Sequence, residues 1–114
     1  PTLIGKMNGS AIRVPTANVS VVDLVVTTSR DTSLDEINQA FREAANGPMR
    51  GVLGFNERPL VSIDFNHDPH SSVADLTQTN VANERFVRVL AWYDNEWGFS
   101  CRMLDTAAAM AKYL

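Results

Sequence analysis

Arg13 is one of two residues in this 114-residue chain whose type and setting could serve ligand binding. It is the lone charge in the apolar run Ala11–Pro15, and its planar guanidinium suits a carboxylate or a phosphate. An unpaired buried charge is costly, so Arg13 needs an anionic partner. An ordinary ion pair to Asp23 or another acid is the alternative that the residues alone favour.

Asn95 is the second such residue, and it lies among aromatic residues in the stretch 92–99. A carboxamide both donates and accepts, which suits recognition of another amide such as that of nicotinamide. The alternative is structural, with Asp94 or Asn95 capping a helix. Phe99 could cover a flat ring in the same way, or it could simply belong to the core.

The histidines and the cysteine give weaker signals. His67 and His70 lie near Asp64 and Asp68, but a proline-containing loop gives no fixed ligand geometry, so we predict hydrogen bonds within the loop or to a neighbouring subunit, and no metal. Cys101 could be a nucleophile, yet helix packing explains a small side chain equally well. No glycine-rich phosphate loop occurs, so the residues alone give no catalytic set.

Composition sets the wider limits. With 45% hydrophobic and 20% charged residues, the chain has the size and balance of one domain. A net charge of −3 argues against nucleic acid or a membrane surface as partner. A single cysteine, no long apolar run and no signal peptide predict a cytoplasmic protein. The start at Pro1, without methionine, predicts a fragment or a processed chain.

Strands and helices must position these residues. β-branched runs predict strands at 10–14 and 19–28, and the second is apolar on both faces, so we expect it to be covered on both sides. Ser33 and Glu36 form a capping box that starts a helix ending at Gly47. Further strands are expected at 60–65, 72–79 and 85–93, after a turn at 49–54, and a final helix at 97–114.

This order predicts an α+β domain. We expect an antiparallel or mixed sheet with the helices packed on one face, and with the other face suited to a subunit interface.

Several motifs, in order and spacing, resemble the glyceraldehyde-3-phosphate dehydrogenase superfamily. They are Ala-Ile-Arg-Val-Pro-Thr and the following Asn-Val-Ser-Val-Val-Asp-Leu, Gly-Val-Leu-Gly, Asp-Phe-Asn, and Trp-Tyr-Asp-Asn-Glu-Trp-Gly-Phe-Ser, at residues 11–16, 18–24, 51–54, 64–66 and 92–100. The resemblance covers essentially the whole chain, which corresponds to about the last third of such an enzyme. It implies a partial C-terminal catalytic domain over residues 1–114, with the N-terminal Rossmann domain and the catalytic cysteine segment absent.

Within the superfamily, residues 59–71, 77–79 and 102–106 most resemble the erythrose-4-phosphate dehydrogenase branch, and Phe99 agrees. That branch implies oxidation of erythrose 4-phosphate to 4-phosphoerythronate, for pyridoxal phosphate synthesis. Some bacterial glyceraldehyde-3-phosphate enzymes share these features, and Tyr93 with the pair Ser100-Cys101 suits them too. Glycolytic glyceraldehyde-3-phosphate dehydrogenase is therefore the alternative.

The resemblance also assigns roles to residues. It implies that Arg13 contacts the substrate phosphate, that Asn95 binds the nicotinamide amide of NAD, and that Phe99 packs near the ring. The catalytic cysteine and its histidine lie upstream in the family, and Cys101 occupies a position where the family usually has asparagine. No catalytic residue is therefore expected in this chain.

The family mechanism is implied in the same way. A cysteine thiolate attacks the aldehyde of a sugar phosphate, hydride passes to NAD, and water or phosphate resolves the thioester. The expected partners are the sugar phosphate, the missing N-terminal part and further copies in a homotetramer. The isolated chain is expected to be inactive, and a non-catalytic assembly module is the alternative of another class.

Overall fold

Four strands form one sheet, in the order β1-β4-β3-β2, in the computed structural model, which describes residues 2–113. The elements run along the chain as follows: β1 (Ser20–Thr27), α1 (Leu34–Asn46), β2 (Leu53–Asn56), the 3-10 helix η1 (Ser62–Phe65), β3 (Ser72–Ala82), β4 (Phe86–Tyr93), α2 (Trp97–Met110) and the 3-10 helix η2 (Ala111–Tyr113). β1 pairs antiparallel with β4, β4 antiparallel with β3, and β3 parallel with β2. The predicted α+β class with a mixed sheet is confirmed.

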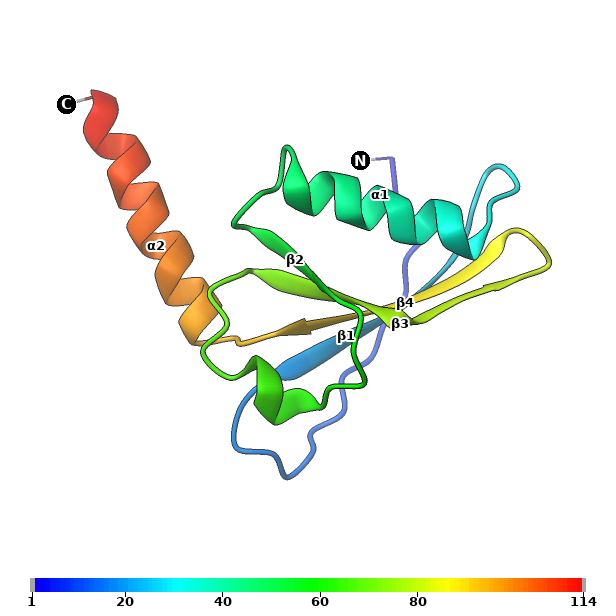
Figure 1. The fold of residues 1–114 in the computed structure, drawn as a ribbon, viewed down its shortest axis with the longest axis horizontal. Helices are drawn as coiled ribbons and strands as arrows, with labels where there is room; N and C mark the ends of the chain where they lie inside the picture. Colours follow the sequence, from blue (N-terminus) through cyan, green and yellow to red (C-terminus); the bar gives the residue numbers. More distant parts are fainter. Residues whose placement is uncertain (1, 114) are drawn as a thin grey trace.

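α1 forms as the sequence predicts. The Ser33 hydroxyl accepts a hydrogen bond from the backbone N–H of Glu36 at 3.2 Å, and the helix ends before Gly47. This helix carries the chain from the edge strand β1 to the opposite edge strand β2, and it lies along one face of the sheet (Figure 1). Asn38, which is buried on its inner side, donates to the carbonyl of Leu76 in β3.

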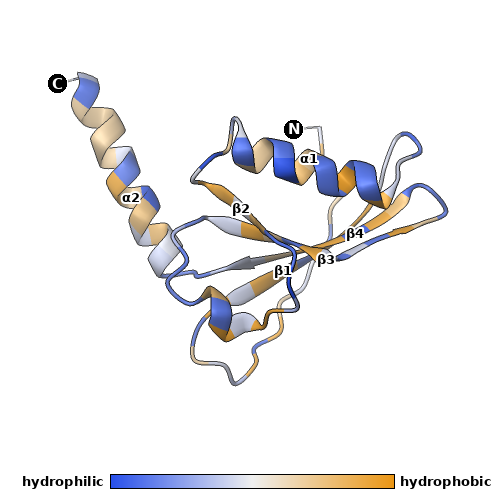
Figure 2. Ribbon diagram, in the orientation of Figure 1, coloured by the Kyte–Doolittle hydropathy of each residue, from blue (hydrophilic) through white to orange (hydrophobic). Residues whose placement is uncertain are grey.

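α2 also forms where a helix is expected, but it does not pack on the sheet. It projects away from the end of β4 (Figure 1). Much of the α2 ribbon is coloured toward the hydrophobic end of the scale in Figure 2. Several of its apolar residues are exposed, with Phe99 at 64%, Met103 at 58% and Leu104 at 72%. Beyond Arg102, nothing among residues 2–113 covers this helix, and the predicted helix end at Leu114 lies outside the described residues. No helix in the described range is long and apolar enough to cross a bilayer.

Two predicted strands are wrong. Residues 10–14 are exposed and pair with no strand of the sheet, whose edge on that side is β1. Residues 62–65 form η1 instead of a strand, since the Asp64 carboxylate accepts from the backbone N–H of Val61 at 2.9 Å and turns the chain. The sheet contains one strand that the sequence does not predict. This is β2 (Leu53–Asn56), which begins within the predicted turn at 49–54.

The main apolar cluster lies on the side of the sheet away from α1, beneath η1. Val19, Phe65 and Val73 are buried there, with Leu60 and Trp92 packed against them. The rings of Phe65 and Trp92 stack at 5.4 Å between centroids. This cluster joins the segment before β1, η1, β3 and β4, so it fixes the end of the sheet from which α2 begins.

β1 is apolar on both faces, as the sequence indicates. Its side chains are nevertheless exposed, including Val22 at 47%, Leu24 at 42% and Val25 at 46%. The expected cover on both sides is therefore not supplied by residues 2–113.

Candidate functional site

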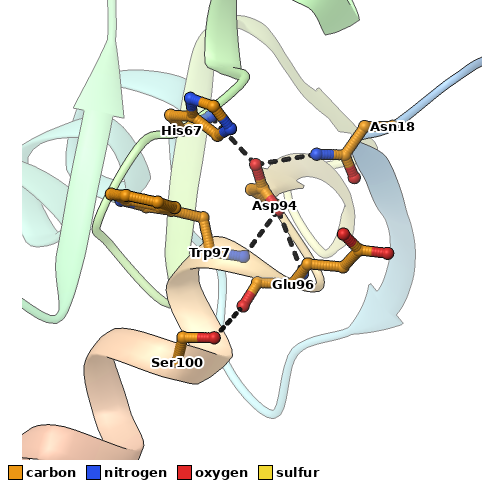
Figure 3. A pocket seen from close by; sticks show the side chains of 6 residues that line it. All are labelled: Asn18, His67, Asp94, Glu96, Trp97 and Ser100. Carbon is orange, nitrogen blue, oxygen red and sulfur yellow. Dashed lines mark hydrogen bonds between the residues drawn. The ribbon is translucent and has the colours of Figure 1, made fainter.

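Asp94 is the centre of a small polar hollow at the junction of β4 and α2. Its side chain is 98% buried, since only 2% of the residue is exposed. Oδ1 accepts from the backbone N–H groups of Glu96 and Trp97 at 3.0 and 2.8 Å. Oδ2 accepts from the backbone N–H of His67 and from the side-chain amide of Asn18, both at 2.9 Å (Figure 3).

The hollow beside this carboxylate measures about 200 Å³ and is open to solvent. Three separate parts of the chain line it, namely the segment before β1, the loop after η1, and the turn between β4 and α2 together with the first turn of α2. The lining residues are Asn18, His67, Asp94, Glu96, Trp97 and Ser100. The Ser100 hydroxyl donates to the Glu96 carbonyl at 2.8 Å, and the His67 ring lies over Trp97 at 4.6 Å (Figure 3).

The carboxylate of Asp94 is held in its charged form. Burial raises its pKa, but the hydrogen bonds from the N–H groups of Trp97, His67 and Glu96 and from the Asn18 amide outweigh burial and lower the pKa to about 2. Asp94 is therefore a fixed negative charge at neutral pH. It serves as an acceptor and not as a general acid.

Two strained residues flank this network. Val19 has φ 69° and His67 has φ 62°, both in the left-handed region that non-glycine residues rarely adopt. For a β-branched residue such as Val19 this costs about 1–3 kcal/mol, which the surrounding structure must offset. Burial of Val19 and the bonds made by Asn18 next to it supply that support.

Asn95 lies on the exposed turn between β4 and α2. Its side chain makes no hydrogen bond to any of residues 2–113, so both its donor and its acceptor are available to a ligand. The neighbours on either side, Asp94 and Glu96, line the hollow, whereas Asn95 itself does not. The alternative of Asp94 or Asn95 as the helix N-cap differs from the structure in position, because the N-cap of α2 is Glu96. The Asp94 carboxylate nevertheless accepts from the backbone N–H groups of Glu96 and of Trp97, the first residue of α2.

Phe99 lies one helical turn beyond Asn95 and is 64% exposed. The reading of Phe99 as a core residue is therefore wrong within the described chain. An exposed carboxamide and an exposed phenyl ring thus occupy the same end of α2, four residues apart.

Arg13 lies in an exposed segment without regular structure, not in a strand. The alternative that paired it with Asp23 is wrong, because Asp23 forms a two-bond ion pair with Arg88 at 2.8 and 2.9 Å. Among residues 2–113 Arg13 makes no ion pair, which leaves its guanidinium available to an anion. No hydrogen bond among residues 2–113 joins Arg13 to Asn95, so the structure does not link the two predicted binding residues directly.

The remaining candidates have structural contacts. His70 Nδ1 lies 2.7 Å from the Asp68 carboxylate, which agrees with the expectation that the loop is held by its own hydrogen bonds. No group of three or more metal-binding side chains occurs among residues 2–113. Cys101 is half-buried in α2 and does not line the hollow.

The sequence does not identify Asn18, His67 and Ser100 as parts of one site. Asn18 follows the Arg-Val-Pro-Thr stretch, and a polar residue between proline and an apolar strand gives only a weak turn signal. The residues that meet at Asp94 are separated by up to 76 positions. No local pattern could have identified them as neighbours.

Gly98 holds the first turn of α2 close to the loop after η1. A Cβ atom at this position would lie 2.7 Å from the carbonyl oxygen of His70, which is backbone and cannot move aside freely. We expect Gly98→Ala to lower the free energy of unfolding by about 1–3 kcal/mol, as measured by urea denaturation.

Gly9→Ala is the matched control for this prediction. Nothing lies within 4 Å of the added methyl group at Gly9, so its effect should stay within about 0.5 kcal/mol. An equal effect of the two substitutions would contradict the close approach at Gly98.

Comparison with known proteins gives one consistent result. The family model for "Glyceraldehyde 3-phosphate dehydrogenase, C-terminal domain" matches residues 1–95. A glyceraldehyde-3-phosphate dehydrogenase of Cereibacter sphaeroides is 60% identical over 114 residues, covering 100% of this chain and 34% of the relative. Enzymes of the same name from Pseudomonas aeruginosa (59% identical, 97% of this chain, 32% of the relative) and Chlamydomonas reinhardtii (chloroplastic form A, 55% identical, 98% and 30%) are similar too.

Two facts follow from these comparisons. The chain spans about a third of the length of the curated relatives that it matches. The names of those relatives favour the second of the two branches considered from the sequence, glyceraldehyde-3-phosphate dehydrogenase, over erythrose-4-phosphate dehydrogenase.

Proposed function

This chain belongs to the glyceraldehyde 3-phosphate dehydrogenase family, as its C-terminal domain, and from that premise we propose that it forms the substrate- and cofactor-contacting part of an NAD-dependent glyceraldehyde-3-phosphate dehydrogenase. Two relatives that align with the whole chain at 60% and 56% identity are named glyceraldehyde-3-phosphate dehydrogenase, which is the observation that supports the proposal most directly. The full-length protein is accordingly an oxidoreductase.

Erythrose-4-phosphate dehydrogenase is the second candidate. The stretch Asp-Phe-Asn-His-Asp-Pro-His at residues 64–70 and Phe99 favour it, since both resemble that branch. The two substrates differ by one hydroxymethylene unit while sharing an aldehyde and a terminal phosphate. Arg13 would serve either one in the same way, so it cannot discriminate between them.

The exposed groups at the start of α2 fit NAD. The Asn95 carboxamide has an unused donor and acceptor, which a nicotinamide carboxamide can pair with through two hydrogen bonds. The exposed Phe99 ring can pack beside a flat heterocycle. A bound NAD would supply the hydride acceptor, and Asn95 would fix which way the ring faces.

Arg13 would hold the substrate phosphate with its guanidinium. A fork of N–H donors matches two phosphate oxygens, and the resulting charge-assisted bonds orient the aldehyde end toward the reacting groups. The nucleophilic cysteine and its histidine would come from the part of the enzyme that precedes this chain, as the family resemblance implies. This chain therefore binds and orients, and supplies no catalytic residue of its own.

The partners proposed are the N-terminal part of the same enzyme and further copies of it. The exposed apolar strand β1 supports assembly into a homo-oligomer, because side chains such as Val22 and Leu24 gain stability when covered. Analytical ultracentrifugation of the full-length enzyme tests this, and a monomer at micromolar concentration would contradict it. We also propose a cytoplasmic location, on the composition alone.

A turnover assay tests the proposed function. Full-length enzyme containing this chain is given NAD with glyceraldehyde 3-phosphate or erythrose 4-phosphate, with and without inorganic phosphate, and NADH is followed. We expect a higher kcat/KM for glyceraldehyde 3-phosphate, and dependence on phosphate, because phosphate resolves the thioester in this branch.

Other results of the assay point to the alternatives. A preference for erythrose 4-phosphate without phosphate dependence would favour the second candidate. No turnover on either substrate would favour the non-catalytic assembly module. Residues 1–114 alone should form no NADH, because the nucleophile lies outside them.

A further inference from the structure

Asp94 does more than start a helix, because its two oxygens face different parts of the chain. Oδ1 binds the N–H groups of Glu96 and Trp97, which follow Asn95 on the same turn. Oδ2 binds the N–H of His67 and the amide of Asn18, which come from elsewhere in the sequence. One carboxylate therefore ties the turn that carries Asn95 to two other segments (Figure 3).

Asn18 is the second half of this connection. Its side-chain nitrogen donates to Asp94 Oδ2 and to Asn66 Oδ1, each at 2.9 Å. It lies five positions after Arg13, between the unpaired segment 10–17 and the strained, buried Val19. The side chain of Asn18 is therefore an anchor that links the arginine-bearing segment to the rest of the fold.

We propose that Asp94 is a positioning residue, whose carboxylate fixes the Asn95 turn against Asn18 so that the cofactor-binding amide and the anion-binding segment keep one fixed relation. This inference rests on the proposed function, since it assigns Asp94 an effect that passes through Asn95. The geometry explains how Arg13 and Asn95, which make no hydrogen bond to each other, keep a fixed relative position. It also explains why a carboxylate is used, because a neutral amide has one acceptor oxygen and cannot accept on both sides.

The test compares full-length enzymes carrying Asp94→Asn, Asn95→Ala and both changes, with KM for NAD and for glyceraldehyde 3-phosphate measured separately from kcat. We expect Asp94→Asn to raise KM for NAD about tenfold, as expected for the loss of one or two charge-assisted hydrogen bonds. The double variant should be no worse than Asn95→Ala, because both changes remove the same interaction.

Asp75→Asn is the matched control. Asp75 is equally buried, at 3% exposed, and accepts from the Trp92 ring N–H at 3.0 Å and from Thr77. It touches neither the Asn95 turn nor Asn18, so its replacement should lower stability without changing KM for NAD. Its effect should add to that of Asn95→Ala.

Asn18→Ala keeps the test decisive if Asp94→Asn fails to fold. This change removes one of the four bonds to Asp94 and leaves the start of α2 intact, and it should raise KM for NAD and for the aldehyde together. The inference alone is overturned if Asn95→Ala raises KM for NAD while Asn18→Ala has no effect, or if the Asp94 and Asn95 effects add. If Asn95→Ala leaves KM for NAD unchanged, the proposed cofactor role fails and the inference fails with it.

Discussion

Arg13→Leu is expected to lower kcat/KM for glyceraldehyde 3-phosphate by a factor of about 100–1000 in the full-length enzyme. The guanidinium has no partner among residues 2–113, so a bound phosphate would be its main charge contact. Loss of a two-bond charge-assisted contact costs about 3–4 kcal/mol in transition-state binding. Steady-state kinetics with varied substrate measure the change.

The loss should be specific to the phosphorylated substrate. Glyceraldehyde without phosphate should react equally poorly with wild type and Arg13→Leu, since it lacks the group that Arg13 holds. The kcat/KM of Arg13→Lys for glyceraldehyde 3-phosphate should fall between those of wild type and Arg13→Leu, because an ammonium keeps the charge but lacks the planar fork. Arg58→Leu is the control, as Arg58 is likewise exposed and without an ion pair among the described residues. An equal loss with both aldehydes would remove Arg13 from the phosphate site.

Asp94→Asn is expected to destabilise the folded chain by about 2–3 kcal/mol at pH 7, the linkage value for a pKa lowered from 3.8 to about 2. The folded-state pKa lies below the unfolded one, so the native state favours the charged form. This stabilisation is complete above about pH 4 and is lost as the pH falls toward 2, with about half remaining near pH 3. The stability curves of wild type and variant should therefore converge in acid.

Urea denaturation at pH values from 7 down to 3 measures this difference. The stability that the wild type loses in acid does not come from Asp94 alone. Hydrogen bonds from Arg30 and, to a smaller extent, from Thr32 also lower the pKa of Glu36 to about 2. Glu36 is present in both proteins, so its contribution cancels in the comparison. If the difference in the free energy of unfolding between wild type and variant stays constant from pH 7 to pH 3, the charge of Asp94 does not stabilise the folded chain.

Much of the fold could be predicted from local pattern. The capping box at Ser33 predicts the start of α1, because its hydrogen bond joins residues only three positions apart. Alternating apolar residues predict β3 and β4, because a period of two can be read from the local sequence even though the pairing partners are distant. The strand predicted at 60–65 failed for the opposite reason. Its apolar residues fit a strand, but Asp64 captures the Val61 N–H and the chain turns into η1.

The sequence by itself determined the α+β class, the cap of α1 and, through the spacing of its motifs, the resemblance that the family comparison confirms. These depend on residue order and on hydrogen bonds between near neighbours. Only the tertiary structure decided that β2 lies beside β3, that α2 projects from the sheet, and that Asn18, His67 and Asp94 meet. The physical reason is that a carboxylate can select partners far away in sequence only after the sheet and the Phe65–Trp92 cluster have brought them within hydrogen-bond distance.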